Sequence, residues 1–261
     1  MTLRIVPLYP ELLSIYADRG NVRVLEQRAR WRGLSVEVVP LALGESFDPE
    51  QADVVLIGGG QDRDQALVAE ALIAQVPALR SAIADGVPVL AVCGGYQLLG
   101  HRYVDQSGRH TPGTGLVDLE THAGSTRLVG NVVVDVELAG TRHELVGFEN
   151  HAGRTILGAG VAPLGKVIVG GGNDGTGTAE GCLEGRIVGT YVHGPLLPKN
   201  PWLADQLLAW ACEHRGLSTT LAPLDDHLEQ AAAVAASTLA RSERRYGTHI
   251  RPSETNASPG R

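Results

Sequence analysis

Cysteine is scarce in this chain of 261 residues, which contains only Cys93, Cys182 and Cys212 and no Cys-x-x-Cys pair. An odd and sparse set argues against a disulfide framework and is typical of a reducing compartment. The Cys and His residues also lack the close spacing of metal ligands, so we expect no metal site. A chain of this length can bury a hydrophobic core without such cross-links.

Positive charge is also in short supply, with 22 Lys and Arg against 29 Asp and Glu and a net charge of −7. Sequence-independent binding of nucleic acid needs clustered Lys and Arg, so we expect no nucleic-acid partner. No apolar run approaches the roughly 18 residues of a membrane span. The first residues lack the pattern of a signal peptide. We therefore expect a cytoplasmic protein without a membrane span.

Continuously apolar segments alternate with segments of helical periodicity in the first half of the sequence. This alternation predicts a largely parallel sheet with helices on both faces. The apolar segments are 3–9, 34–41, 53–57 and 87–92, and the helical segments are 21–31, 65–84 and one that starts near Tyr96.

The second half has a different pattern, with strand-like segments joined by Gly- and Asn-rich turns. These segments, 127–138, 143–148 and 166–169, predict antiparallel strands added to the α/β core. A further strand over 183–191 precedes two helices, over 202–214 and 222–245. We expect one domain over residues 1–246, with a helical extension from about residue 217, and a disordered tail over 247–261.

The segment Val-Leu-Ala-Val-Cys-Gly-Gly-Tyr-Gln at 89–97 carries the strongest chemical signal. A buried strand, a nucleophile, two small residues and a helix form the turn that Ser and Cys hydrolases use. A helix N-terminus stabilises the thiolate of Cys93, and the N–H of Gly94 can donate to an oxyanion. The alternative is a structural cysteine that ends a buried strand.

A thiol nucleophile needs a base, and His193 follows the predicted strand 183–191. Because the carboxyl ends of parallel strands meet at one edge of a sheet, His193 can lie near Cys93. His151 is the rival base, and we expect the other histidines to be structural. Gly58-Gly59-Gly60 ends a third buried strand and can complete an oxyanion hole, although glycines also serve ordinary turns.

Nucleotide-binding motifs are weak or missing. Residues 170–175 match Gly-x-Gly-x-x-Gly, but the residues that follow cannot open the helix that a dinucleotide site requires. The sequence contains no Walker A motif. We therefore expect no cofactor in this chain.

Taken together, the Gly-Gly-Gly strand end, the Cys-Gly-Gly-Tyr-Gln turn and the late His resemble the class I glutamine amidotransferases. The Tyr-Val-His-Gly-Pro segment at 191–195 resembles their cobyric acid synthase-like branch. Segments 58–62, 147–151 and 193–201 resemble the GatD family, the glutaminase subunits of lipid II isoglutaminyl synthases. The resemblance covers residues 3–216 and implies a flavodoxin-like α/β fold with added antiparallel strands.

The resemblance also implies a mechanism. Cys93 would attack the side-chain amide of L-glutamine, while His193 takes the thiol proton and passes it to ammonia. The N–H groups of Gly60 and Gly94 would hold the oxyanion. Further substrate contacts would come from Arg127, which suits the glutamine carboxylate, and from Gln97 and Gly59.

A partner would use the ammonia. By resemblance it is a Mur-ligase-like subunit of the MurT type, which binds ATP and Mg and forms a heterodimer with this chain. It would amidate the α-carboxyl of D-glutamate in the stem peptide of lipid II, at the cytoplasmic face of the membrane. The alternatives are a subunit of a cobyrinate-type synthase and a catalytically silent binding or regulatory subunit.

One position departs from the pattern of class I amidotransferases. Many of them carry a glutamate two residues after the catalytic His, whereas this chain has Pro195 there. The imidazole still needs a group that fixes its tautomer. We expect an acid from elsewhere in the fold, with Glu149 as a candidate, or from the partner, which would couple glutamine hydrolysis to assembly.

Overall fold

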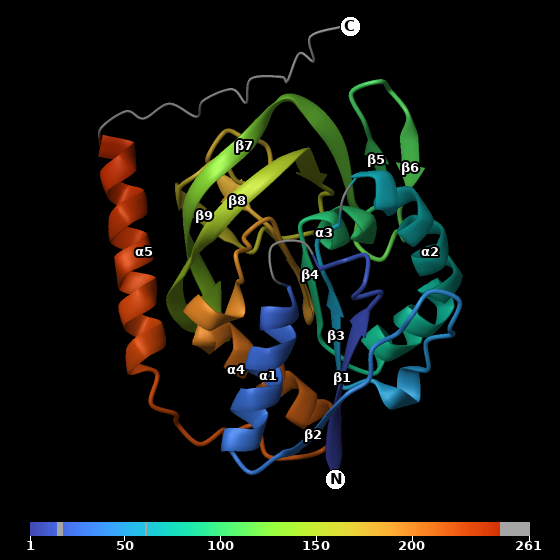
Figure 1. Ribbon diagram of the computed structural model, residues 1–261, viewed down its shortest axis with the longest axis vertical. Helices are drawn as coiled ribbons and strands as arrows, with labels where there is room; N and C mark the ends of the chain where they lie inside the picture. The colour runs from blue at the N-terminus through green and yellow to red at the C-terminus, as the bar shows by residue number, and fades with distance from the viewer. Residues whose placement is uncertain (15–17, 61, 246–261) are drawn as a thin grey trace, which may run out of the picture.

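The computed structural model, which describes residues 1–14, 18–60 and 62–245, contains a six-stranded central sheet (Figure 1). Five strands are parallel and β11 is antiparallel to its neighbour. The order matches the doubly wound flavodoxin-like arrangement and confirms the predicted α/β fold. Across the sheet the strands are β11 (Cys182–Glu184), β12 (Ile187–Thr190), β4 (Val89–Val92), β3 (Val54–Ile57), β1 (Thr2–Leu8) and β2 (Ser35–Val38).

Helices cover both faces of this sheet (Figure 1). The helices α1 (Arg19–Trp31) and α4 (Pro201–His214) share one hydrophobic core with one set of strand side chains. The helices α2 (Asp62–Ala84) and α3 (Gly94–Leu99) share the other core. Neighbouring residues of a strand point to opposite faces, so continuously apolar strands serve both cores.

Within the described residues, the part of α2 from Leu67 to Ala84 is long and apolar enough to cross a membrane, with a mean hydropathy of 1.4. The expectation that no segment reaches this length and hydropathy is therefore wrong. Its buried residues, among them Leu72 and Leu79, belong to the core beside the sheet. With 28% of this segment buried, α2 packs one face against the core and leaves its other residues partly or fully exposed.

A second sheet carries the predicted antiparallel strands. Its centre is a long hairpin of β7 (Leu119–Leu138) and β8 (Thr141–Leu157), interrupted by a register shift between Ala123 and Leu128. Both strands extend beyond the predicted segments, which covered only their apolar parts. The remaining strands are β5 (Arg102–Val104), β6 (His110–Pro112), β9 (Gly165–Val169) and β10 (Ala179–Glu180).

The hairpin touches the central sheet at the end of β12. Phe148 of β8 and His193 exchange two backbone hydrogen bonds, of 3.0 and 2.9 Å. A Cβ atom at Gly147 would lie 2.4 Å from Cγ1 of Val192, so only glycine permits this approach. The hairpin is thereby fixed against the carboxyl edge of the parallel strands.

The predicted strand 183–191 is two strands, β11 and β12, separated by a turn at Gly185 with a φ of 58°. Glycine adopts this left-handed conformation without a steric penalty, so the apolar run does not form one strand. The predicted helix 222–245 begins at His227, as α5 (His227–Arg245), and lies beside the second sheet (Figure 1). The predicted disordered tail lies outside the described residues.

Candidate functional site

Cys93 occupies a strained turn between β4 and α3. Its φ and ψ are 52° and −109°, and a non-glycine residue seldom adopts a positive φ. A Cβ atom at Gly95 would lie 2.4 Å from the carbonyl oxygen of Ile57, and the N–H of Gly95 donates to the oxygen of Gly58 at 3.1 Å. The predicted strand–nucleophile–helix turn is therefore present, with a small residue where β3 passes close by.

His193 comes from the strand next to that of Cys93. In the parallel pair of β4 and β12, Val92 lies beside Thr190, and the N–H of Cys93 donates to the oxygen of Thr190 at 2.8 Å. His193 lies three residues beyond β12, is 1% exposed and packs edge-on against Phe148. The predicted nucleophile and the predicted base thus follow neighbouring parallel strands and lie at the same edge of the sheet.

The surroundings keep His193 neutral. Burial, together with the neighbouring His151, Arg127 and Lys199, lowers the pKa of His193 to about 4. At neutral pH the imidazole is therefore unprotonated, which is the form that can accept a proton from a thiol. A pKa this low also makes it a weak base until a negative charge stabilises the imidazolium.

The oxyanion candidates lie beside the nucleophile. A Cβ atom at Gly59 would be 3.4 Å from Cβ of Cys93, so the end of β3 lies against the catalytic turn. Gly94 is the first residue of α3, where an N–H has no acceptor within the helix. The N–H of Gly59 donates to Oδ2 of Asp18 at 2.7 Å, which leaves Gly60 and Gly94 as the candidate donors to an oxyanion.

Arg127 of β7 lies over the same edge. Its Nη2 donates to the carbonyl oxygen of Asn150 at 3.0 Å, and its Nε donates to the side-chain oxygen of Asn150. The guanidinium is exposed and close enough to influence His193. This position allows Arg127 to meet a substrate carboxylate. Gln97, by contrast, is buried and donates to the Tyr191 hydroxyl at 3.3 Å, so its predicted contact with substrate stays a prediction.

Comparisons with known proteins agree with this geometry. The profile of the CobB/CobQ-like glutamine amidotransferase domain matches residues 4–201. The chain belongs to this family. The amidotransferase is 40% identical to the GatD subunit of the glutamine-hydrolysing lipid II isoglutaminyl synthase of Staphylococcus aureus, across 87% of this chain and 91% of the relative. The resemblance inferred from the sequence is thereby confirmed.

Two further relatives and one solved structure extend the comparison. The GatD subunit of Streptococcus pneumoniae is 36% identical, across 88% of this chain and 89% of the relative. A cobyric acid synthase of Pelotomaculum thermopropionicum is 34% identical, across 64% of this chain but 34% of the relative. PurLQS of Thermotoga maritima has a TM-score of 0.52 at 17% identity, covering 74% of this chain and 88% of that one, which shows the shared fold.

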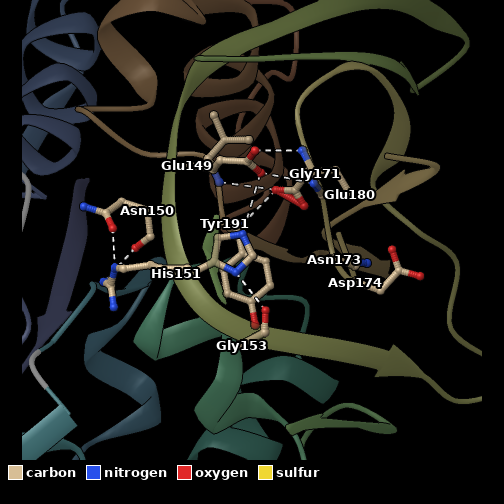
Figure 2. Close-up of polar contacts among 12 residues, drawn as sticks. Glu149, Asn150, His151, Gly153, Gly171, Asn173, Asp174, Glu180 and Tyr191 are labelled. Carbon is tan, nitrogen blue, oxygen red and sulfur yellow. Dashed lines mark hydrogen bonds and ion pairs between the residues drawn. The ribbon is translucent and has the colours of Figure 1, made fainter. Parts of the chain in front are cut away.

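Glu149, the candidate third acid, is engaged elsewhere in the amidotransferase (Figure 2). Its carboxylate accepts the N–H groups of Gly171 and Gly172 at 2.7 and 3.1 Å and lies 3.7 Å from Nε2 of His151. It therefore fixes the glycine turn that resembles a dinucleotide motif. Among the described residues, no group of three or more His, Cys, Asp and Glu side chains is arranged to hold a metal ion.

His151, the rival base, is part of the same buried network. Its ring stacks on Tyr191, with ring centroids 3.6 Å apart, and its Nδ1 lies 2.9 Å from the carbonyl oxygen of Gly153 (Figure 2). Burial lowers the pKa of His151. These contacts engage His151 with Tyr191 and Gly153, and the choice of His193 as the base stays a prediction.

Glu180 is a positioning residue that sequence analysis missed. Its Oε1 accepts the Thr190 hydroxyl at 2.5 Å and the N–H groups of Tyr191 and Val192 at 2.7 and 3.2 Å. These groups form the segment that leads to His193. Glu180 stands in a glycine-rich stretch without periodicity, so only the three-dimensional contacts show its role.

Glu180 should give the folded protein a specific pH dependence. Burial raises the pKa of Glu180 from 4.5 to about 7, so between these values the folded state holds a proton that the unfolded state has released. The contribution of Glu180 to the free energy of unfolding must therefore fall as the pH rises from about 4.5 to about 7.

Glu180→Gln keeps an acceptor for the three donors and removes this titration. We measure the free energy of unfolding of wild type and variant by chemical unfolding at pH 4.5 and at pH 8. Between these pH values, the free energy of unfolding of the variant should rise relative to that of wild type by on the order of 3 kcal/mol. The exposed Glu184→Gln is the matched control. The same pH dependence in wild type and Glu180→Gln would contradict the assignment.

Proposed function

We propose that this chain is the glutamine-hydrolysing subunit of a lipid II isoglutaminyl synthase. One observation carries the proposal: a strained Cys93 and a buried His193 stand on neighbouring strands of a chain that aligns with 91% of a GatD subunit. The reaction is the hydrolysis of L-glutamine to glutamate and ammonia.

The chemistry proceeds through a thioester. His193 takes the proton of the Cys93 thiol, and the sulfur attacks the side-chain carbonyl carbon of glutamine. The N–H groups of Gly60 and Gly94 stabilise the negative oxygen that forms. When the tetrahedral intermediate collapses, the C–N bond breaks and His193 gives its proton to the departing ammonia. Water, deprotonated by His193, then hydrolyses the γ-glutamyl thioester.

A Mur-ligase-like partner of the MurT type would consume the ammonia. Supported by the resemblance, we assign ATP and Mg to that partner, which activates the α-carboxyl of D-glutamate in the lipid II stem peptide. Ammonia then converts this residue to D-isoglutamine. The two chains form a heterodimer at the cytoplasmic face of the membrane, and the relatives' description as subunits supports such a complex.

The partner also provides the third catalytic group in this proposal. Pro195 stands where many class I enzymes have a glutamate, and Glu149 is occupied by the turn at Gly171 and Gly172. A carboxylate from the partner would raise the pKa of His193 from about 4 and make it a stronger base. Glutamine hydrolysis would then depend on assembly, which limits the waste of ammonia.

Two other functions are less well supported. A cobyrinate-type synthase is less well supported, because the GatD subunits are 40% and 36% identical across 87% and 88% of this chain, whereas the cobyric acid synthase is 34% identical across 64% of it. A silent binding subunit would not require a cysteine with a φ of 52° and a neutral buried histidine at the ends of neighbouring strands.

The catalytic pair is tested by measuring ammonia release from L-glutamine, with and without the co-expressed Mur-ligase-like partner. We expect Cys93→Ala and His193→Ala to lower kcat by roughly four orders of magnitude, because each removes a group that the chemical step requires. We expect the partner to raise the wild-type rate. The buried Cys212→Ala is the control and should keep its activity. No release by any combination would contradict the enzyme function, and full release without the partner would contradict the coupling.

Arg127 is tested by the concentration dependence of the same reaction. Removing a charged partner of the glutamine carboxylate should raise KM by roughly tenfold to a hundredfold in Arg127→Ala, with a smaller change in kcat. Arg127→Lys should recover part of the loss. Arg142→Ala removes an exposed arginine of the same hairpin and should leave KM unchanged. An unchanged KM in Arg127→Ala would rule out this contact.

A further inference from the structure

The amino end of α1 lies between the two segments that carry the candidate site. Gly59, at the end of β3, donates its N–H to Oδ2 of Asp18 at 2.7 Å. Nδ2 of Asn21 lies 3.4 Å from Oδ1 of Asp18, and Oδ1 of Asn21 accepts the N–H of Leu197 at 2.9 Å. Leu197 lies four residues beyond His193, so one chain of hydrogen bonds joins both halves of the site.

This chain of hydrogen bonds is shielded from water. Asp18 is 6% exposed and Asn21 is 1% exposed. A buried hydrogen bond cannot be replaced by one to solvent, so the loss of either side chain leaves polar groups unpaired. The contacts therefore restrain the backbone more strongly than similar contacts on the surface would.

The backbones at both ends approach α1 closely. A Cβ atom at Gly58 would lie 2.9 Å from Oδ2 of Asp18, and a Cβ atom at Gly20 would lie 3.1 Å from the ring of Pro195. Pro195 is the position at which many class I amidotransferases carry their third catalytic residue. Here the space around it is taken up by packing against α1.

The helix itself is firmly held. Arg28 is buried and forms ion pairs of 2.7 Å with Asp205 of α4 and 2.5 Å with Asp226. The segment beyond His193 is also held from the opposite side, where Asn200 accepts the N–H of Val146 at 2.9 Å and donates to the oxygen of Leu196 at 2.7 Å. Rigid supports therefore stand on both sides of the segment that follows the base.

We propose that Asp18 and Asn21 are positioning residues that hold the oxyanion strand and the His193 segment in register. Asp18 fixes the peptide between Gly58 and Gly59, and so the orientation of the neighbouring Gly60 N–H. Asn21 transmits the same restraint to the residues after His193. The effect on catalysis rests on the proposed glutaminase function, whereas the mechanical link between the two segments does not.

An exchange of the two side chains tests the link. In Asp18→Asn two amide NH₂ groups face each other, and in Asn21→Asp two carboxylates do. In the double variant D18N/N21D every donor again finds an acceptor: the new amide accepts from Gly59 and donates to the new carboxylate, which accepts from Leu197. Asp48→Asn changes an exposed aspartate that caps a 3₁₀ turn and is the matched control.

The variants are compared with wild type at pH 8, as the full chain with its co-expressed partner, in two measurements. Amide hydrogen exchange reports the mechanical link. We expect each single variant to speed exchange at both Gly59 and Leu197, and the double variant to restore slow exchange. Ammonia release reports catalysis. We expect each single variant to lower kcat by about tenfold or more with little change in KM, and the double variant to recover most of that loss.

The outcomes separate this inference from the proposed function. The inference is overturned if a single variant changes hydrogen exchange only at the segment next to the substituted residue. It is also overturned if the double variant folds but restores neither slow exchange nor kcat. If thermal melting shows that the double variant is unfolded, the link is tested with Asn21→Ala instead. Hydrogen exchange at Gly59 that is unchanged in this variant would overturn the link. A wild-type complex that releases no ammonia would overturn the proposed function, and hydrogen exchange would still decide the link.

Discussion

The backbone at Cys93 keeps its positive φ because neighbouring strand ends hold it from both sides. On one side the N–H of Cys93 is bonded to Thr190, and on the other the N–H of Gly95 is bonded to Gly58. Such a conformation costs on the order of 1–3 kcal/mol and persists only where the surrounding structure enforces it. The parallel register of β3, β4 and β12 supplies that enforcement and places the ends of β3 and β12 beside the nucleophile.

The second sheet adds further residues of the candidate site to this edge of the central sheet. Its hairpin contributes Phe148, which holds the backbone of His193, and Arg127, whose charge helps to lower the pKa of His193. Glu149 of the hairpin and Glu180 of β10 accept backbone N–H groups of two separate segments. Buried carboxylates with this many donors restrain loops that have little apolar surface of their own. Rigidity at the site thus comes from polar networks as much as from packing.

The sequence predicted what is local. Continuous apolar strands, a Cys-Gly-Gly turn and a His after the last parallel strand all depend on neighbouring residues, and their placement follows from the rule that parallel strands share an edge. Asp18 was missed because its partner Gly59 is 41 residues away, and Glu180 because no local pattern pairs it with the backbone of Tyr191, 11 residues further on. The length of β7 was underestimated because its first half is polar and contains a register shift, which weakens the alternation. The role of Glu149 depends on the same long-range contacts.

The proposed hydrolysis of glutamine requires that Cys93 forms a covalent γ-glutamyl thioester. It is tested most directly by mixing the complex with isotopically labelled glutamine, quenching in acid during turnover and mapping the adduct by mass spectrometry. We expect a γ-glutamyl adduct on Cys93 in the wild type and none in Cys93→Ala. Ammonia released without an adduct, or with the adduct on another residue, would contradict it.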